Sequence, residues 1–147
     1  KAEVALGNVV RALSAADGPD GRPLVRAAHD LSNGGLVQSL VDSALRFGIG
    51  GVFDVAGAAR RDCVGDHEML LSESQARAFV AVPEAAVKAV FAAAEAEGVD
   101  AVRIGTTGGD MLAISGVDLL AAEGEGCGWI ASIDELRELS ETGRKYF

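Results

Sequence analysis

The sequence has little cysteine and no long apolar run. Cys63 and Cys127 are its only cysteines and lie 64 residues apart. Neither belongs to a close set of four cysteine and histidine residues, so the sequence argues against a disulfide scaffold and against a structural zinc site. No apolar run approaches the roughly 18 residues that a membrane-spanning helix needs, and the first residues do not form a signal peptide. We therefore expect a cytoplasmic protein whose thiols are reduced.

Basic residues are also scarce. Lysine and arginine together number 13 against 22 acidic residues, so the formal net charge is −9. Such a charge repels phosphate backbones and anionic lipid, and no cluster of basic residues offsets it. We therefore expect neither nucleic-acid binding nor membrane binding. An anionic ligand would have to be held locally, by backbone donors or by a metal ion.

The composition that remains is that of a globular protein. Hydrophobic residues make up 49% and charged residues 24% of the 147 residues, which suits one domain with a substantial core. We expect residues 1–147 to form a single domain. The sequence begins at Lys1 and not at a methionine, so we also expect it to be a fragment of a larger protein.

Apolar periodicity and turn residues predict the order of the elements. Helices are expected at 1–16, 36–47, 83–97 and 132–141, and strands at 24–28, 51–55, 78–82, 99–104 and 111–114. The last two strands should pair as a hairpin or through a bulged connection. Residues 56–66 and 121–128 are expected to be loops, the first with a short helical turn, and 143–147 a tail. The result is an α+β fold whose core, at 24–115, is a mixed β-sheet covered by helices.

The most informative stretch is the turn from His29 to Gly35, which leads into the helix that ends at Phe47. Backbone N–H groups at a helix N-terminus attract anions, and the two glycines of the turn let a bulky group approach the backbone. The turn therefore predicts a phosphate site. A plainer interpretation stays open: the glycines serve only the turn, and the helix is capped by Asp30, Ser32 or Asn33.

The helix after this turn is amphipathic. Its apolar side, which we expect to be buried, carries Leu36, Val37, Leu40, Val41, Ala44 and Leu45. Its polar side, which we expect to be exposed, carries Gln38, Ser39, Asp42, Ser43 and Arg46.

Two short segments concentrate polar groups, the turn at 29–35 and the run at 72–75. Each follows a predicted strand or helix, so in a sheet protein both could lie at one edge. The candidate ligand-binding residues in these segments are His29, Asp30, Ser32, Asn33, Gly34, Gly35, Glu73, Ser74 and Gln75.

Several chemical roles are open to these side chains. Asp30 and Glu73 could hold Mg²⁺ for a phosphorylated ligand, and Gln75 could donate to an amide or a phosphate. Each of them could equally be a solvated carboxylate or a helix cap. His29 and Asp30 are neighbours in a strand and should point to opposite faces, so they should pair poorly as a base and its orienting carboxylate. The sequence shows no Ser/His/Asp set and no nucleotide-binding fingerprint, and we predict no catalytic residue.

Three motifs occur in an order and spacing that resemble a known family. They are AHDLSNGGL at 28–36, LLSESQARAFVAV at 70–82 and RIGTTGGDMLAI at 103–114. The chain, from about residue 1 to 139, is similar to the C-terminal domain of the phosphoribosylformylglycinamidine synthase large-subunit family, in the aminoimidazole ribonucleotide synthetase superfamily. The His-Asp-Leu-Ser form of the first motif resembles the second, C-terminal copy of this domain.

The resemblance implies an ATP-dependent, amidine-forming carbon–nitrogen ligase of purine biosynthesis. Such an enzyme makes formylglycinamidine ribonucleotide from formylglycinamide ribonucleotide, ATP and glutamine-derived ammonia, and it uses Mg²⁺. The implied partners are the remaining domains of the same chain, a glutaminase subunit and a small accessory subunit. The implied fold is α+β in three layers. Because most ATP-binding and catalytic residues of the family lie in other domains, the resemblance implies that this chain alone is inactive.

The chain departs from the family at one position of the substrate-binding motif. In the first copy of the domain the family has a Gln-Asp pair and a Glu-Ser-Gln run. Here the run is kept as Glu73, Ser74 and Gln75, but His29 replaces the glutamine before Asp30. For the second copy the resemblance implies instead a pseudo-symmetric site, which holds an auxiliary nucleotide or no ligand. Two alternatives to the ligase domain stay open: a structural interface module with a degenerate ligand pocket, or another ATP-dependent member of the superfamily such as selenophosphate synthetase or thiamine monophosphate kinase. The fragment hypothesis also predicts an exposed apolar face.

Overall fold

The structure, a computed structural model, describes residues 1–116 and 128–144. It divides into two compact units: unit 1 contains Lys1–Ser32 and Glu73–Val102, and unit 2 contains Asn33–Ser72 and Arg103–Phe147. None of the helices in the described ranges is long and apolar enough to cross a membrane. Cys63 is an exposed free thiol, whereas Cys127, the predicted loop up to residue 127 and the end of the predicted tail lie outside the described residues.

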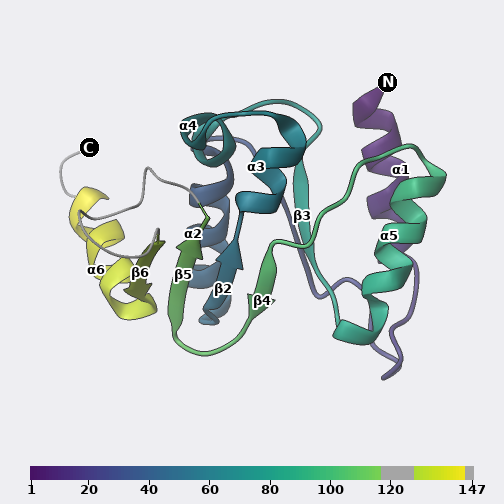
Figure 1. Cartoon of the computed structure of the whole chain (residues 1–147). Helices are drawn as coiled ribbons and strands as arrows, with labels where there is room; N and C mark the ends of the chain where they lie inside the picture. Colours follow the sequence, from purple (N-terminus) through teal and green to yellow (C-terminus); the bar gives the residue numbers. More distant parts are fainter. Residues whose placement is uncertain (117–127, 145–147) are drawn as a thin grey trace. The chain divides into compact units, whose positions relative to one another are not determined.

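Unit 1 pairs two helices with a two-stranded ladder. Helix α1 (Ala2–Ser14) packs against α5 (Val87–Ala96), which follows the short 3-10 helix η1 (Glu84–Ala86), and Figure 1 shows the two α-helices side by side. Strand β1 (Ala27–Asp30) runs antiparallel to β3 (Ala78–Ala81). The buried core of this unit consists of Val9, Leu13, Leu24 and Ala86, and Val82, Val90, Ala93 and Val99 pack against it.

Unit 2 contains a four-stranded mixed sheet in the order β4-β2-β5-β6. The strands are β2 (Gly51–Asp54), β4 (Gly105–Thr107), β5 (Met111–Ser115) and β6 (Gly128–Ser132). Strand β2 is parallel to β5, and the other neighbours are antiparallel. The helices are α2 (Gly35–Phe47), α3 (Ala56–Asp62), α4 (Asp66–Leu71) and α6 (Ile133–Arg144). Helix α2 packs against both α4 and α6.

One face of this sheet is buried and the other carries exposed apolar side chains. Leu112 and Ile114 of β5 are each only 1% exposed, and they alternate along the strand with residues of the other face. On that other face Val52, Ala113 and Ile130 are cross-strand partners in one row. Val52 is 64% and Ile130 63% exposed. This row is an exposed apolar surface of the kind that the fragment hypothesis predicts.

The α+β class and the mixed sheet predicted from the sequence are confirmed, as are helices α1, α2, α5 and α6 and strands β2, β3 and β5. Strand β1 lies later than the predicted 24–28 and includes His29 and Asp30, which were assigned to the turn. The predicted strand at 99–104 is wrong, because the strand is β4 at Gly105–Thr107. Val99 instead packs on the core of unit 1.

The predicted hairpin is also wrong. Strands β4 and β5 are consecutive in sequence, but β2 lies between them in the sheet and pairs with both. The pairing of β2 with β5 joins segments about 60 residues apart, and turn residues carry no information about such a distant partner.

Three further expectations fail for local reasons. The segment 56–66, expected to be a surface loop with a short helical turn, instead contains the seven-residue helix α3, and Ala58 on this helix is 2% exposed. Seven residues are too few to show a helical period in the sequence. Ser39 is buried, and its hydroxyl donates to the Gly35 carbonyl at 2.8 Å, which satisfies the polar group inside the protein. The spacing of Leu139 from Ile133 and Leu136 predicts that it lies on the apolar face of α6, but it is 67% exposed.

Ser132 and Glu135 have the sequence spacing that predicts a capping box, and this box is present at the start of α6. The Glu135 N–H donates to Ser132 Oγ at 3.2 Å, and the Ser132 N–H donates to Glu135 Oε2 at 2.8 Å. These backbone and hydroxyl donors hold the pKa of Glu135 below its ordinary value of 4.5. The box therefore satisfies two donors that the helix itself leaves unpaired.

We expect the Ser132→Ala substitution to lower the free energy of unfolding by about 1 kcal/mol at pH 7, because it removes the cap. Since the folded-state pKa of Glu135 is depressed, its contribution is present at neutral pH and is lost as pH falls below the ordinary value and through the folded value. Urea titrations at pH 7 and at pH 3 should show the difference between wild type and variant shrinking in acid. Glu138→Gln, an exposed change on the same helix, is the control, and an equal loss in it would contradict the capping role.

Candidate ligand-binding site

The parts of the two polar segments that belong to unit 1, residues 29–32 and 73–75, lie at one end of the β1–β3 ladder. Asp30, the last residue of β1, lies opposite Ala78, the first residue of β3. The Leu31 N–H donates to the Arg77 carbonyl at 3.0 Å, which extends the pairing past the ends of both strands. Glu73, Ser74 and Gln75 immediately precede this point. Antiparallel pairing therefore brings the Glu-Ser-Gln run to the same end of the ladder as His29, Asp30 and Ser32.

His29 and Asp30 differ in exposure and in contacts. The Asp30 side chain is 77% exposed and the His29 side chain 30%. His29 Nδ1 donates to the backbone carbonyl of Asp30 at 2.6 Å and lies 3.6 Å from the Asp30 carboxylate. The hydrogen bond thus goes to the backbone and the carboxylate lies beyond hydrogen-bond distance, so the poor pairing of the two side chains as a base and its orienting carboxylate stays a prediction. The Phe79 ring stacks on the imidazole with a centroid distance of 5.8 Å.

The remaining candidates, Asn33, Gly34 and Gly35, belong to unit 2 and lie at the N-terminus of α2. Gly34 is the N-cap with a φ of 76°, and no side chain caps the helix. The alternative in which Asp30, Ser32 or Asn33 caps this helix is therefore wrong. Left-handed backbone at the cap favours glycine, which has no Cβ to clash.

The close approach that the glycines were expected to allow is made by the chain itself. Gly35 has a φ of +66°, and a Cβ on it would lie 2.6 Å from the Leu70 carbonyl oxygen and 2.7 Å from the Leu71 carbonyl carbon. The end of α4 thus packs directly on the first turn of α2. This contact explains why position 35 is a glycine without any role in ligand binding.

The candidate residues can supply at most one or two carboxylate ligands to a Mg²⁺ ion. Among the residues the structure describes, no three His, Cys, Asp or Glu side chains are placed to share a metal ion. Mg²⁺ commonly keeps several waters and binds through one or two carboxylates together with substrate phosphates. Asp30, being exposed, suits that mode of binding, in which water and a phosphorylated ligand would supply the other oxygens.

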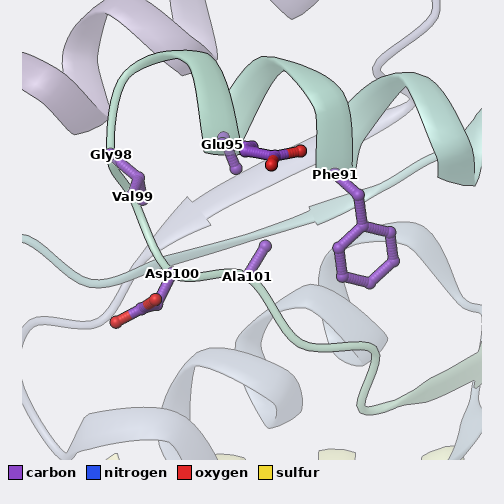
Figure 2. A pocket seen from close by; sticks show the side chains of 7 residues that line it. Phe91, Glu95, Gly98, Val99, Asp100 and Ala101 are labelled. Carbon is purple, nitrogen blue, oxygen red and sulfur yellow. The ribbon is translucent and has the colours of Figure 1, made fainter.

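Two cavities in the described ranges are lined by other residues than these. The larger, about 350 Å³, is in unit 1 between the C-terminal half of α5 and the segment that follows it. Figure 2 shows Phe91 and Glu95 projecting from α5 toward this space, with residues 98–101 along its other side. The apolar spacing in the sequence places Phe91 on the apolar face of α5, but its side chain is 41% exposed. The second cavity, about 180 Å³, is in unit 2 beside the start of α6.

Sequence reasoning missed Phe79. It is a strand residue with an ordinary apolar side chain, and nothing in its spacing marks it as part of a site. Only the register of the ladder, which sets Phe79 opposite His29, shows that it contacts a candidate residue.

Comparison with known proteins gives consistent similarities. The family described as AIR synthase related protein, C-terminal domain, matches residues 1–115. A protein of Renibacterium salmoninarum named phosphoribosylformylglycinamidine synthase subunit PurL is 41% identical over 125 residues, which are 84% of this chain and 15% of that protein. A protein of the same name from a Nocardioides species is 45% identical over 93 residues, which are 63% of this chain and 12% of that protein.

A solved structure, described as "T. maritima PurL complexed with ATP", shares the fold. Its TM-score is 0.60 at 16% sequence identity, and the match covers 77% of this chain and 19% of that one. The chain thus spans about 12–15% of the length of the two relatives from Renibacterium and Nocardioides.

Proposed function

Because this chain belongs to the family of AIR synthase related C-terminal domains, we propose that it is the C-terminal domain of a phosphoribosylformylglycinamidine synthase subunit. The whole enzyme would convert formylglycinamide ribonucleotide, ATP and glutamine-derived ammonia into formylglycinamidine ribonucleotide, as an ATP-dependent carbon–nitrogen ligase of purine biosynthesis in the cytoplasm. The observation that carries the proposal is the 41% identity with a protein of that name over 84% of the chain.

ATP and Mg²⁺ are the cofactors of the proposed enzyme, and this chain would supply part of the surface around them. Mg²⁺ bound there would neutralise phosphate charge and orient the nucleotide. Asp30 would hold the ion or a ligand hydroxyl, and Glu73, Ser74 and Gln75 would add polar groups at the same end of the β1–β3 ladder. The chain alone would be inactive. The T. maritima protein, which shares the fold and whose structure is a complex with ATP, supports a nucleotide as the ligand class.

The proposed partners are the remaining domains of the same protein, a glutaminase subunit and a small accessory subunit. The exposed row of Val52, Ala113 and Ile130 in unit 2 supports burial of this chain against other protein, because it places apolar side chains together on an open sheet face. The relatives extend well beyond the matched segment, which is consistent with further domains as the partner.

The proposal is tested in the intact protein that carries this chain, by the ATP- and glutamine-dependent formation of formylglycinamidine ribonucleotide. Asp30→Ala should lower kcat/KM roughly tenfold or more, because hydrogen bonds to charged groups are worth about 1.5–3 kcal/mol. Since the side chain is 77% exposed, the variant should fold normally, which circular dichroism would check. Asp100→Ala, an exposed carboxylate elsewhere in unit 1, is the matched control and should stay within about twofold.

A structural role is the second candidate, and the packing of Gly35 favours it for the α2 terminus. The backbone of Leu70 and Leu71 already occupies the space in front of this glycine. A fully active synthase in which Asp30→Ala has no effect would support the structural module. An intact protein without synthase activity would overturn the ligase and point to another ATP-dependent member of the superfamily.

A further inference from the structure

His29 has a defined tautomer in this structure. Its Nδ1 lies 2.6 Å from the backbone carbonyl oxygen of Asp30, and a carbonyl can only accept a hydrogen bond. Nδ1 must therefore carry the hydrogen. In the neutral imidazole the lone pair is then on Nε2, which becomes a hydrogen-bond acceptor.

Phe79 restrains the plane of the same ring. The two residues are direct cross-strand partners in the β1–β3 ladder, so their side chains share one face of it. The rings are stacked, with an interplanar angle of 18° and a centroid distance of 5.8 Å. The stack limits the tilt of the imidazole, and the bond to the Asp30 carbonyl limits its rotation. Together they fix the direction in which Nε2 points.

Nε2 remains available to a ligand. Within the described ranges the imidazole makes its hydrogen bond through the other ring nitrogen, Nδ1. The side chain is 30% exposed, so the imidazole is mostly enclosed while still reachable. A nitrogen that is oriented in advance costs little conformational entropy when it binds a donor.

We propose that His29 presents Nε2 as an acceptor to a hydroxyl or amino group of a ribonucleotide, and that Phe79 is the positioning residue for it. A neutral acceptor beside the Asp30 carboxylate suits the O–H and N–H donors of a ribose or a base better than it suits a phosphate. This inference rests on the proposed function, from which the ribonucleotide ligand is taken. It adds which groups of the ligand are recognised, the hydroxyl or amino donors, and it adds Phe79, which was not among the predicted site residues.

The acceptor role is tested by two substitutions of His29 in the intact protein. His29→Gln keeps an acceptor oxygen, whereas His29→Phe keeps a ring against Phe79 and loses the acceptor. Binding is measured by titration calorimetry with formylglycinamide ribonucleotide, and separately with ATP and Mg²⁺. For one of these two ligands, the affinity of His29→Phe should be about tenfold weaker than that of wild type, and the affinity of His29→Gln should stay within about threefold of it. Unchanged binding of both ligands to His29→Phe would overturn the acceptor role.

The positioning role is tested without activity, by the ¹⁵N chemical shifts of the His29 ring above its titration range. Spectra of labelled protein, with the signals assigned by difference from His29→Gln, should show hydrogen on Nδ1 in wild type and a mixture of tautomers in Phe79→Leu. Phe79→Tyr should restore the wild-type shifts, and Phe91→Leu, which alters an exposed ring on α5, should leave them unchanged. Hydrogen on Nε2 in wild type, or identical shifts in Phe79→Leu, would overturn the inference.

The binding and chemical-shift results, together with the synthase activity, test the role of His29 and Phe79 separately from the proposed function. A protein that makes formylglycinamidine ribonucleotide but binds both ligands normally as His29→Phe refutes the acceptor role and leaves the ligase intact. A protein with the expected tautomer but no synthase activity refutes the ligase and retains the positioning by Phe79.

Discussion

Gly35→Ala should be the most damaging single change at the helix ends of unit 2, with an expected loss of about 3–4 kcal/mol in the free energy of unfolding. Two costs add. The φ of +66° is unfavourable for any residue with a Cβ, and the new methyl group would meet the backbone of Leu70 and Leu71 at 2.6–2.9 Å. Backbone cannot rotate away as a side chain can, so α4 would have to move off α2.

Gly48→Ala is the matched control, because it separates the two costs. Gly48 lies at the other end of the same helix with a similar φ of +63°, and nothing lies within 4 Å of the position of its Cβ. It should lose only the conformational part, about 1–2 kcal/mol. Urea unfolding followed by the fluorescence of Trp129, the only tryptophan of this chain, gives both values. Equal losses in the two variants would show that the contact with α4 does not bear on stability.

The second large effect is expected in the sheet, where Leu112→Ala should cost about 3 kcal/mol. Leu112 is 1% exposed and lies on β5, which has β2 on one side and β6 on the other. Truncation there leaves a cavity that the neighbouring strands cannot close, since both are hydrogen-bonded to β5 along its length. The cost therefore includes the lost contacts as well as the lost burial.

Val52→Ala is the control for this change. It removes apolar atoms from the opposite face of the adjacent strand, where the side chain is 64% exposed, and it should cost less than about 1 kcal/mol. The same chemical denaturation experiment serves for both. A loss at Val52 as large as that at Leu112 would mean that the row of Val52, Ala113 and Ile130 is covered in solution.

The parts of the fold that the sequence predicts well are those decided by neighbours in the chain. The left-handed glycines at both ends of α2 and the Ser132–Glu135 box at the start of α6 each act within a few residues. Ser39 shows the limit of this reasoning even inside a helix. Its burial depends on a hydrogen bond to the Gly35 carbonyl, which periodicity alone does not reveal.

The candidate site also has parts that can be predicted from the sequence and parts that cannot. His29, Asp30 and the Glu73–Gln75 run stand out in the sequence because polar groups are concentrated there next to apolar segments. Their meeting at one end of the ladder depends on the β1–β3 register, which joins residues about 50 positions apart. Phe79 could not be found at all without that register, since an apolar strand residue is expected at its position whether or not it contacts a histidine.

The position of β2 between β4 and β5 also constrains the order of folding. Strands β4 and β5 run in opposite directions and are separated by only three residues, so a local hairpin between them could close quickly during folding. That hairpin would block the place of β2 and would have to open again. Native assembly instead waits for a distant segment, and long-range pairing of this kind slows folding. A nascent chain therefore gains most from having residues 51–54 and α2 in place before 105–115 emerge.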